Sequence, residues 1–423
     1  MTDFTQKIKL AFTDKDLRKR LLFVFFVLVI FRLGANIPIP GVDVMRLAEL
    51  FDTNRFFQLF NVFSGGGLSN LSLFMLGVGP YITASIIMQL LTMIFPRLRE
   101  MYHEEGTAGR KKFTQYSRLL TVPLAVIQGF SLLVLLKQNG VLTELTALDQ
   151  IVNIALVVAG SMILMWLGEL ITQYGIGNGV SLIIFAGIVS SIPSALTQVY
   201  AARAIQEIPT YIGFLVAAVL IVAGVIIITE AERPIPITYA KRVRGMKVYG
   251  GISTYLPLRV NQAGVIPIIF ALSILLFPQL IVNFLGTSGN SIVQGISSLL
   301  QAFIANLALY GFFYFVLVFL FTYFYTAVTF DPDAIAKNLQ KNGAFIPGVR
   351  PGPQTAAYIG TILTRITLVG ALFLGAIAVL PFIMQAITGN QALAIGGTGL
   401  LIVVSVVLDF IKRIDAQTSM REY

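Results

Sequence analysis

The sequence predicts an all-α polytopic membrane protein with ten transmembrane helices around a pore. Composition, mean hydropathy and the length of the apolar runs lead to this fold class. Of the 423 residues, 56% are hydrophobic and only 12% are charged, and the mean hydropathy is +0.83. Soluble domains carry roughly a quarter charged residues, so this chain has too few to cover a water-soluble globule.

Ten apolar segments are long enough to cross the roughly 30 Å hydrocarbon core of a bilayer, which takes about 20 helical residues. The first segment follows Lys15, Arg18, Lys19 and Arg20, as the apolar part of a signal peptide would. Because nine further spans follow and no small-residue cleavage pattern is evident, we interpret it as a retained helix. The predicted spans are residues 20–36, 72–95, 118–137, 151–172, 180–199, 211–229, 262–285, 303–328, 366–387 and 393–411.

The distribution of basic residues predicts the orientation. Cytoplasmic loops of membrane proteins carry an excess of Lys and Arg. If both termini face the cytoplasm, 25 of the 30 Lys and Arg residues lie on that side and 5 on the outer side. We therefore expect a multi-pass protein of the inner (cytoplasmic) membrane with both termini cytoplasmic.

Ten spans divide into two halves of five, residues 20–199 and 200–413, followed by a tail at 414–423. An odd repeat places its two copies in opposite orientations, as in inverted-repeat transporters. Residues 77–84 and 264–271 both fit G-V-x-P-x-I-x-A. Chance is the alternative, because Gly and Pro are common in membrane helices, but the equivalent position in each half favours duplication.

Two further segments are apolar without being long enough to span. Residues 1–19 carry Phe4, Ile8 and Phe12 at helical spacing among basic residues, which predicts an amphipathic helix at the cytoplasmic surface. Residues 56–70 are apolar and then break at three successive glycines. Such a segment is either a helix lying flat on the outer leaflet or a re-entrant stub surrounded by protein.

Two cytoplasmic loops look structured. Residues 231–261 are rich in β-branched and aromatic residues around Gly250-Gly251, which predicts a hairpin. In the loop at 331–358, Asp331 and Pro332 predict the start of a short helix and Asn342-Gly343 its end. The basic residues of these loops either satisfy the positive-inside rule alone or form a docking surface for a cytosolic partner. Loops this elaborate favour docking.

Several chemistries are disfavoured. The chain has no cysteine and one histidine, His103, which excludes disulfides and thiol catalysis and leaves almost nothing for a histidine-based metal site. No phosphate-binding G-x-x-x-x-G-K-[ST] motif occurs. The middle of every predicted span lacks ionisable residues, which ion-coupled transporters usually need. We expect no enzyme activity and no cofactor.

Two stretches of about 20 residues carry a family resemblance. Residues 72–91 (SLFMLGVGPYITASIIMQLL) and 166–185 (WLGELITQYGIGNGVSLIIF) resemble the two signatures of the SecY/SEC61-alpha family of protein-conducting channels. Residues 38–43 and 346–353 also match. The resemblance covers the whole chain and implies the same ten-span plan, two inverted halves around an hourglass pore.

The resemblance implies a ring of aliphatic side chains at the narrowest point of that pore. Two pairs of the matching residues are spaced i,i+4 and so share a helix face. An apolar constriction resists wetting and so blocks ions. Val78 replaces the isoleucine usual at its position, which should loosen the seal slightly. The matching residues are Val78, Ile82, Ile184, Ile188, Ile269 and Ile402.

The resemblance also implies a plug and a lateral gate. The stub at 56–70 matches the plug. The second and seventh spans would face each other as a gate that opens toward lipid, with polar positions at Thr83, Gln128 and Asn261. The plug residues that we expect are Phe60, Val62, Phe63, Ser64, Gly65 and Gly66.

The function implied is translocation of unfolded, signal-peptide-bearing polypeptides across the membrane and their lateral release into lipid. The cytoplasmic loops would dock the motor ATPase SecA or a translating ribosome through Arg350 and, more weakly, Lys241, Arg242 and Arg244. SecE and SecG would be the small membrane subunits. The alternatives are an inverted-repeat transporter of a small solute and an intramembrane enzyme. The uncharged midplane disfavours the transporter, and the lack of any catalytic set at membrane depth disfavours the enzyme.

Overall fold

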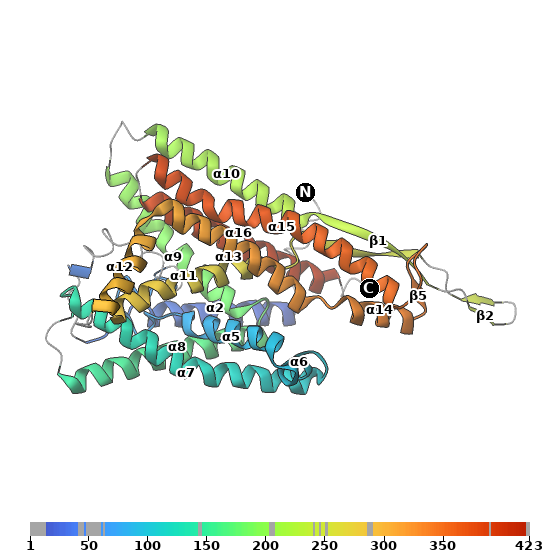
Figure 1. The fold of residues 1–423 in the computed structure, drawn as a ribbon, viewed down its shortest axis with the longest axis horizontal. Coiled ribbons are helices and arrows are strands. Elements are labelled where there is room, and N and C mark those ends of the chain that lie inside the picture. Colours follow the sequence, from blue (N-terminus) through green and yellow to red (C-terminus); the bar gives the residue numbers. More distant parts are fainter. Residues whose placement is uncertain are drawn as a thin grey trace.

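The fold is a bundle of long helices from which a β-hairpin extends at one end (Figure 1). The computed structural model describes residues 14–40, 46–47, 61, 64–142, 146–202, 208–239, 242–244, 247–249, 253–285, 291–388 and 391–419. We call the end of the bundle that carries the hairpin the hairpin end, and the opposite end the far end.

Two helices of the first half, α2 and α8, start at side-chain caps. The Asp14 side chain accepts hydrogen bonds from the backbone N–H groups of Asp16 and Leu17 and so caps α2. Thr146 and Asp149 form a capping box at the start of α8. The helices described in this half are α2 (Lys15–Gly34), α5 (Gly79–Ile94), α6 (Pro96–His103), α7 (Gly106–Gln138), α8 (Ala147–Tyr174) and α9 (Gly179–Ala202).

The second half repeats the pattern of long apolar helices. α13 starts at Asn306, whose side chain accepts a hydrogen bond from the Leu309 N–H at 3.1 Å. The helices described in this half are α10 (Ile208–Glu230), α11 (Ile266–Leu285), α12 (Ser291–Ala305), α13 (Leu307–Thr329), α14 (Pro332–Lys341), α15 (Pro353–Thr388) and α16 (Gln391–Ser419). The sequence did not predict α12 or α6.

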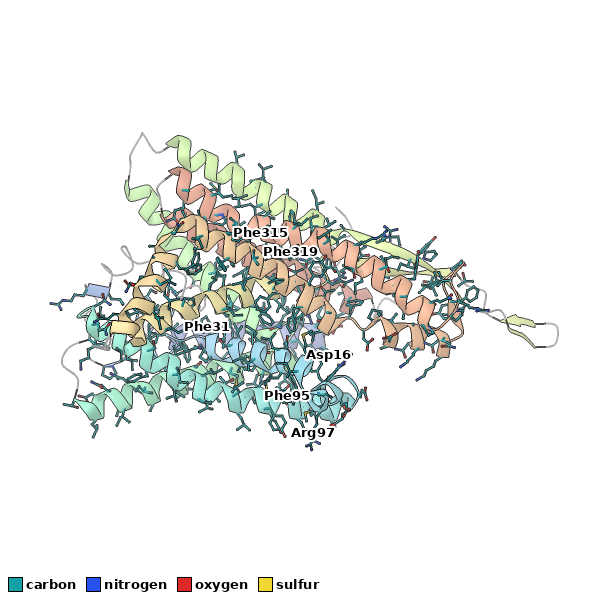
Figure 2. All side chains as sticks on the ribbon, viewed as in Figure 1. Asp16, Phe31, Phe95, Arg97, Phe315 and Phe319 are labelled. Atoms are coloured by element: carbon teal, nitrogen blue, oxygen red, sulfur yellow. The ribbon has the colours of Figure 1, made fainter. Side chains whose placement is uncertain are left out.

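Each predicted span overlaps a helix of the structure, and the span at 303–328 overlaps two, the end of α12 and most of α13. Among the described residues, four helical stretches are long and apolar enough to cross a membrane: Gly106–Gln138, Leu148–Tyr174, Leu307–Lys341 and Pro353–Ala386. The pair α5 and α6 would make a fifth, although the chain bends by 115° between them. Figure 2 shows Phe95 and Arg97 at this bend, at the hairpin end.

The prediction of a helix over residues 72–95 is wrong at its N-terminal end. Residues 64–78 form successive turns, and α5 begins only at Gly79. Gly77 has a φ of 58°, which interrupts a right-handed helix at low cost only for glycine. Pro80 then occupies the first turn of α5, where its missing N–H costs nothing. Hydropathy predicted helix here because these turns are apolar and buried.

The hairpin end combines the two loops predicted to be structured. β1 (Glu232–Tyr239) pairs antiparallel with β4 (Ser253–Arg259), and β2 (Arg242–Arg244) pairs antiparallel with β3 (Lys247–Tyr249). The predicted hairpin is therefore confirmed. Its reversal lies between Arg244 and Lys247, which pair with each other. The two ladders keep one register along the hairpin.

The short helix predicted after Asp331 is also confirmed. The Asp331 carboxylate accepts hydrogen bonds from the N–H groups of Asp333 and Ala334, at 3.0 and 3.2 Å, and Pro332 is the first residue of α14. Asn342 caps the other end, and Gly343 has a φ of 68°. Local capping chemistry thus fixes both ends of α14.

A third strand joins the two loops to the bundle. β5 (Ala344–Phe345) pairs with β1 through Thr238 and Tyr239, which gives the strand order β4-β1-β5. An apolar cluster under this sheet reaches the first turns of α15; its buried members are Ile235, Leu258, Ile346, Ile359, Ile362, Leu363 and Ile366. The two loops and the start of α15 therefore form one packed unit.

The main core lies between the two halves. α5 and α7 of the first half pack against α11 of the second, and α9 packs against α16. One apolar cluster contains buried residues from all of these helices. α8 comes so close to the turns before α5 that a Cβ on Gly160 would lie 1.9 Å from the Leu73 carbonyl oxygen.

We predict that Gly160→Ala destabilises the protein, because the added Cβ must displace backbone and not a flexible side chain. Overpacking of this kind costs typically about 1–3 kcal/mol. The midpoint of thermal unfolding in detergent should fall. The matched control is Gly213→Ala in α10, where a Cβ would meet no atom within 4 Å. Equal midpoints for the two variants would contradict the packing described.

Candidate functional site

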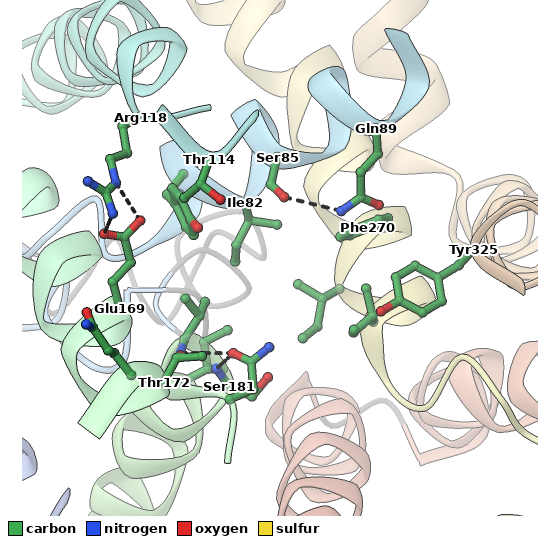
Figure 3. Close-up of a pocket in the computed structure, with 17 residues that line it drawn as sticks. Ile82, Ser85, Gln89, Thr114, Arg118, Glu169, Thr172, Ser181, Phe270 and Tyr325 are labelled. Carbon is green, nitrogen blue, oxygen red and sulfur yellow. Dashed lines mark hydrogen bonds and ion pairs between the residues drawn. The ribbon is translucent and has the colours of Figure 1, made fainter. Parts of the chain in front are cut away.

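A cavity of about 410 Å³ lies between the two halves of the chain. Helices α5, α7, α8 and α9 line it from the first half, and α11 and α13 line it from the second. Figure 3 shows an open centre with Arg118 and Glu169 on one side and Phe270 and Tyr325 on the other. The lining includes the turn between α8 and α9 and the first turns of α11, so the cavity lies nearer the hairpin end. We call it the central cavity.

The predicted ring residues are all buried, but only some of them line this cavity. Ile82, Ile184 and Ile269 line it, from α5, α9 and α11. Val78, Ile188 and Ile402 belong to the same apolar cluster and are 8% exposed or less. A Cβ on Gly399 would lie 3.0 Å from Ile188 Cγ2, so Ile188 packs against α16 one turn before Ile402.

The segment matched to the plug is buried where the structure describes it. Ser64, Gly65 and Gly66 lie in tight turns against α9. A Cβ on Gly187 would lie 1.9 Å from the Gly65 Cα, so the two backbones touch. Gly187 is adjacent to Ile188 and less than one turn from Ile184. The expected residues Phe60, Val62 and Phe63 lie outside the described residues.

Side chains satisfy the irregular backbone of this segment. The Ser64 hydroxyl donates to the Asn61 carbonyl and accepts from the Leu68 N–H, both at 3.0 Å. The Asn61 Oδ1 atom accepts from the Ser69 N–H at 3.0 Å. Buried irregular backbone needs such partners. Residues 64–68 are therefore buried turns and not an exposed helix.

The three polar gate residues do not form one cluster. Thr83 is buried on α5 and donates to the Gly79 carbonyl at 3.0 Å. The Gln128 Oε1 atom lies 4.0 Å from the position of a Cβ on the same Gly79. Asn261 instead donates to the Gly264 carbonyl at 3.3 Å, and its buried Oδ1 has no hydrogen-bond partner.

Asn261 lines a second, smaller cavity of about 230 Å³ at the hairpin end. Three ion pairs lie at or next to this cavity, and each joins a basic residue to a carboxylate. Lys412 Nζ is 2.9 Å from Glu230, Arg413 Nε is 2.8 Å from Asp409, and Arg259 Nε is 3.2 Å from Glu232. Asn178, Ser181, Ile266 and Tyr325 line both cavities, so the two are neighbouring lobes.

The predicted docking residues lie on the loop unit. Arg350 is exposed, just before α15, and its carbonyl accepts a hydrogen bond from the Thr355 hydroxyl at 2.8 Å. Arg242 and Arg244 belong to β2 near the tip of the hairpin. Lys241 lies outside the described residues.

The sequence did not reveal one feature of the central cavity, the ion pair between Arg118 and Glu169. Its distances are 2.8 Å from Arg118 Nε to Glu169 Oε1 and 2.6 Å from Nη2 to Oε2. The sequence alone gave no reason to pair these two residues, because 51 positions separate them. Only the packing of α7 against α8 brings them together. Among the described residues, no group of three or more metal-ligating side chains was found.

A model of the SecY family matches residues 72–411. The chain belongs to the SecY family. It is 43% identical to the protein translocase subunit SecY of Streptomyces coelicolor over 431 residues, which cover 98% of this chain and 97% of the relative. It is also 43% identical to the protein of that name from Pseudomonas aeruginosa, with 96% and 92% covered.

Solved structures of the family share the fold. One described as a protein conducting channel has a TM-score of 0.65 at 20% identity, and the match covers 94% of this chain and 91% of that one. A second, from work on the plug domain of SecY and the closed state of the translocation channel, has a TM-score of 0.66 at 21% identity with the same coverage. The resemblance found in the two signature stretches is thus confirmed at the level of the family.

We predict that Gly187→Ala releases the turn at residues 64–67 from α9, because the added Cβ would overlap the Gly65 backbone. The chain has no native cysteine, so a single Ser64→Cys can report on accessibility. Ser64 is 1% exposed, and we expect little labelling by a maleimide without Gly187→Ala and strong labelling with it. Gly213→Ala serves as the control. Unchanged protection in the Gly187 variant would contradict the contact.

Proposed function

We propose that the chain is the channel subunit of a protein translocase, through which unfolded polypeptides cross the cytoplasmic membrane or leave sideways into lipid. Family membership over nearly the whole chain carries this proposal. Both relatives compared above are named as translocase subunits, and the similar structures are described as channels and not as enzymes or solute carriers. A cavity between the two halves, large enough for side chains of an extended strand, fits such a role.

In this proposal the central cavity is the cytoplasmic vestibule of an hourglass. Ile82, Ile184 and Ile269 would form the seal at its base with Val78, Ile188 and Ile402. Branched aliphatic side chains hold each other by packing alone, so they separate for a passing strand without breaking hydrogen bonds. Closed, such a constriction resists wetting and excludes ions.

We assign the hairpin end to the cytoplasm. The 25 to 5 division of basic residues supports this orientation, and it gives ten spans with both termini cytoplasmic. The proposed units are the two inverted halves 20–199 and 200–413, an amphipathic segment at 1–19 and a tail at 414–423.

The plug and the gate follow from contacts on either side of the cavity. The turn at 64–67, held against α9 beside two ring residues, would seal the far side and withdraw on opening. α5 and α11 pack directly on each other, and their separation would open the lateral gate, with Thr83, Gln128 and Asn261 near it.

Energy for transport comes from partners in this proposal. SecA or a translating ribosome would dock on the loop unit, with Arg350 as the main contact and Lys241, Arg242 and Arg244 as weaker ones. A structurally similar chain is Sec61 of the canine ribosome–channel complex. SecE and SecG would complete the membrane complex around this chain.

We predict that a stalled secretory chain crosslinks to cysteines that replace Ile82 or Ile402. Both positions are buried in the bundle of the resting protein, at 5% and 0% exposure, so only a chain inside the pore can reach them. The measurement is gel-shift detection of a crosslink between the stalled chain and each single-cysteine variant. Ile127→Cys on α7, at 64% exposure, is the lipid-facing control. Equal yields at all three positions would rule out the pore assigned here.

We also predict that tying α5 to α11 stops transport. Gln89 and Ile266 both line the central cavity but belong to opposite halves of the chain. If both are replaced by cysteine, a bifunctional thiol crosslinker should join α5 to α11 and keep the gate closed. Secretion into proteoliposomes should stop, and a cleavable linker should restore it. Gln89 and Thr114 line the same cavity, but both belong to the first half. A crosslinker between cysteines at these two positions is the control, because it occupies the cavity without joining the two halves. If the two pairs block equally, gate opening is not the cause.

A further inference from the structure

The central cavity contains one ion pair in an otherwise uncharged lining. Among the described residues that line it, Arg118 and Glu169 are the only charged side chains. The facing wall carries Phe270 and Tyr325 (Figure 3). A polypeptide in the cavity therefore meets fixed charge on one side only.

The geometry orients the arginine firmly. Two N–H groups of the Arg118 guanidinium donate to the two carboxylate oxygens of Glu169, at 2.8 and 2.6 Å. Bidentate pairs of this kind hold the planar guanidinium in one orientation, which a single-point contact would not do. The two residues come from α7 and α8, so the position of the guanidinium is fixed by two packed helices.

The two partners differ in exposure. The Arg118 side chain is 46% exposed and the Glu169 side chain 17%. Both residues line the cavity, and the Arg118 side chain has more of its surface open to contact than the Glu169 side chain. The ion pair occupies two of the five N–H donors of the guanidinium, so further donors are available to an acceptor on a passing chain.

We propose that Arg118 contacts the carboxylates and backbone carbonyls of the polypeptide in the central cavity, and that Glu169 is the positioning residue that moderates this contact. The inference rests on the proposed function. With Glu169 in place, the carboxylate opposes the positive charge of the guanidinium, so acidic segments pass without being retained. Without Glu169, an unpaired cation faces the cavity, binds acidic segments and repels basic ones.

The test uses the reconstituted translocase and three secretory substrates that differ only in one internal segment, which is acidic, basic or neutral. We expect Glu169→Gln to slow the acidic and the basic substrates roughly two- to fivefold relative to the neutral one, as expected for a partly exposed charge contact. Arg118→Gln should slow the basic substrate, because an unpaired carboxylate then retains it. The double variant should move all three substrates at one common rate.

The control variant is Glu105→Gln, which removes the carboxylate of the surface pair with Lys112 at 3.9 Å. It should leave the rates of the three substrates unchanged. If the pair only braced α7 against α8, every variant of Arg118 and Glu169 would slow all three substrates by the same factor, and that result would overturn the inference. If the unaltered translocase moves none of the substrates, the proposed function itself fails.

Discussion

Every peptide group inside an apolar bundle must find its hydrogen-bond partner within the protein. Long helices meet this demand by themselves, and most of the chain is built from them. Residues 64–78 do not, and the structure supplies partners from side chains. Ser64 and Asn61 serve the first turns, the Ser72 hydroxyl donates to the Gly67 carbonyl, and the Ser161 hydroxyl of α8 donates to the Gly77 carbonyl, both at 2.9 Å. The apolar core around these turns depends on this small set of short polar side chains.

The need to satisfy buried peptide groups also affects the position of the candidate site. Non-helical backbone can approach a helix more closely than side chains allow, provided that glycines meet, as Gly65 and Gly187 do. This contact brings a short non-helical segment beside Ile184 and Ile188. The polar wall of the central cavity lies on the other side of the buried isoleucines. In the proposed function, a wet vestibule, an apolar seal and a detachable stub would lie in sequence along one path.

Sequence patterns predicted the parts of the structure whose causes are local. Hydropathy located each long helix, and the Asp331 and Asn342 caps located α14 to the residue. Hydropathy misplaced the start of α5, because buried turns and a buried helix are equally apolar. The positive φ of Gly77 marks where the turns end and the helix can begin. The family resemblance led us to group six aliphatic residues as a predicted ring, and all six are buried. The resemblance did not predict that only three of them line the central cavity. The Arg118–Glu169 pair was missed because it depends on the rotation of α7 and α8 about their axes, which composition does not encode.

The pairing of β5 with β1 has a consequence for how the family can vary. Two residues of one loop are bonded to two residues of the other, and the loop that contains β5 leads into α15, a helix of 36 residues and about 54 Å. A single insertion between α14 and β5 would shift the register and turn Ala344 from the buried side of the sheet to the exposed side. Changes in the lengths of these two loops should therefore be inherited together, so that a change in one persists only where the other compensates for it.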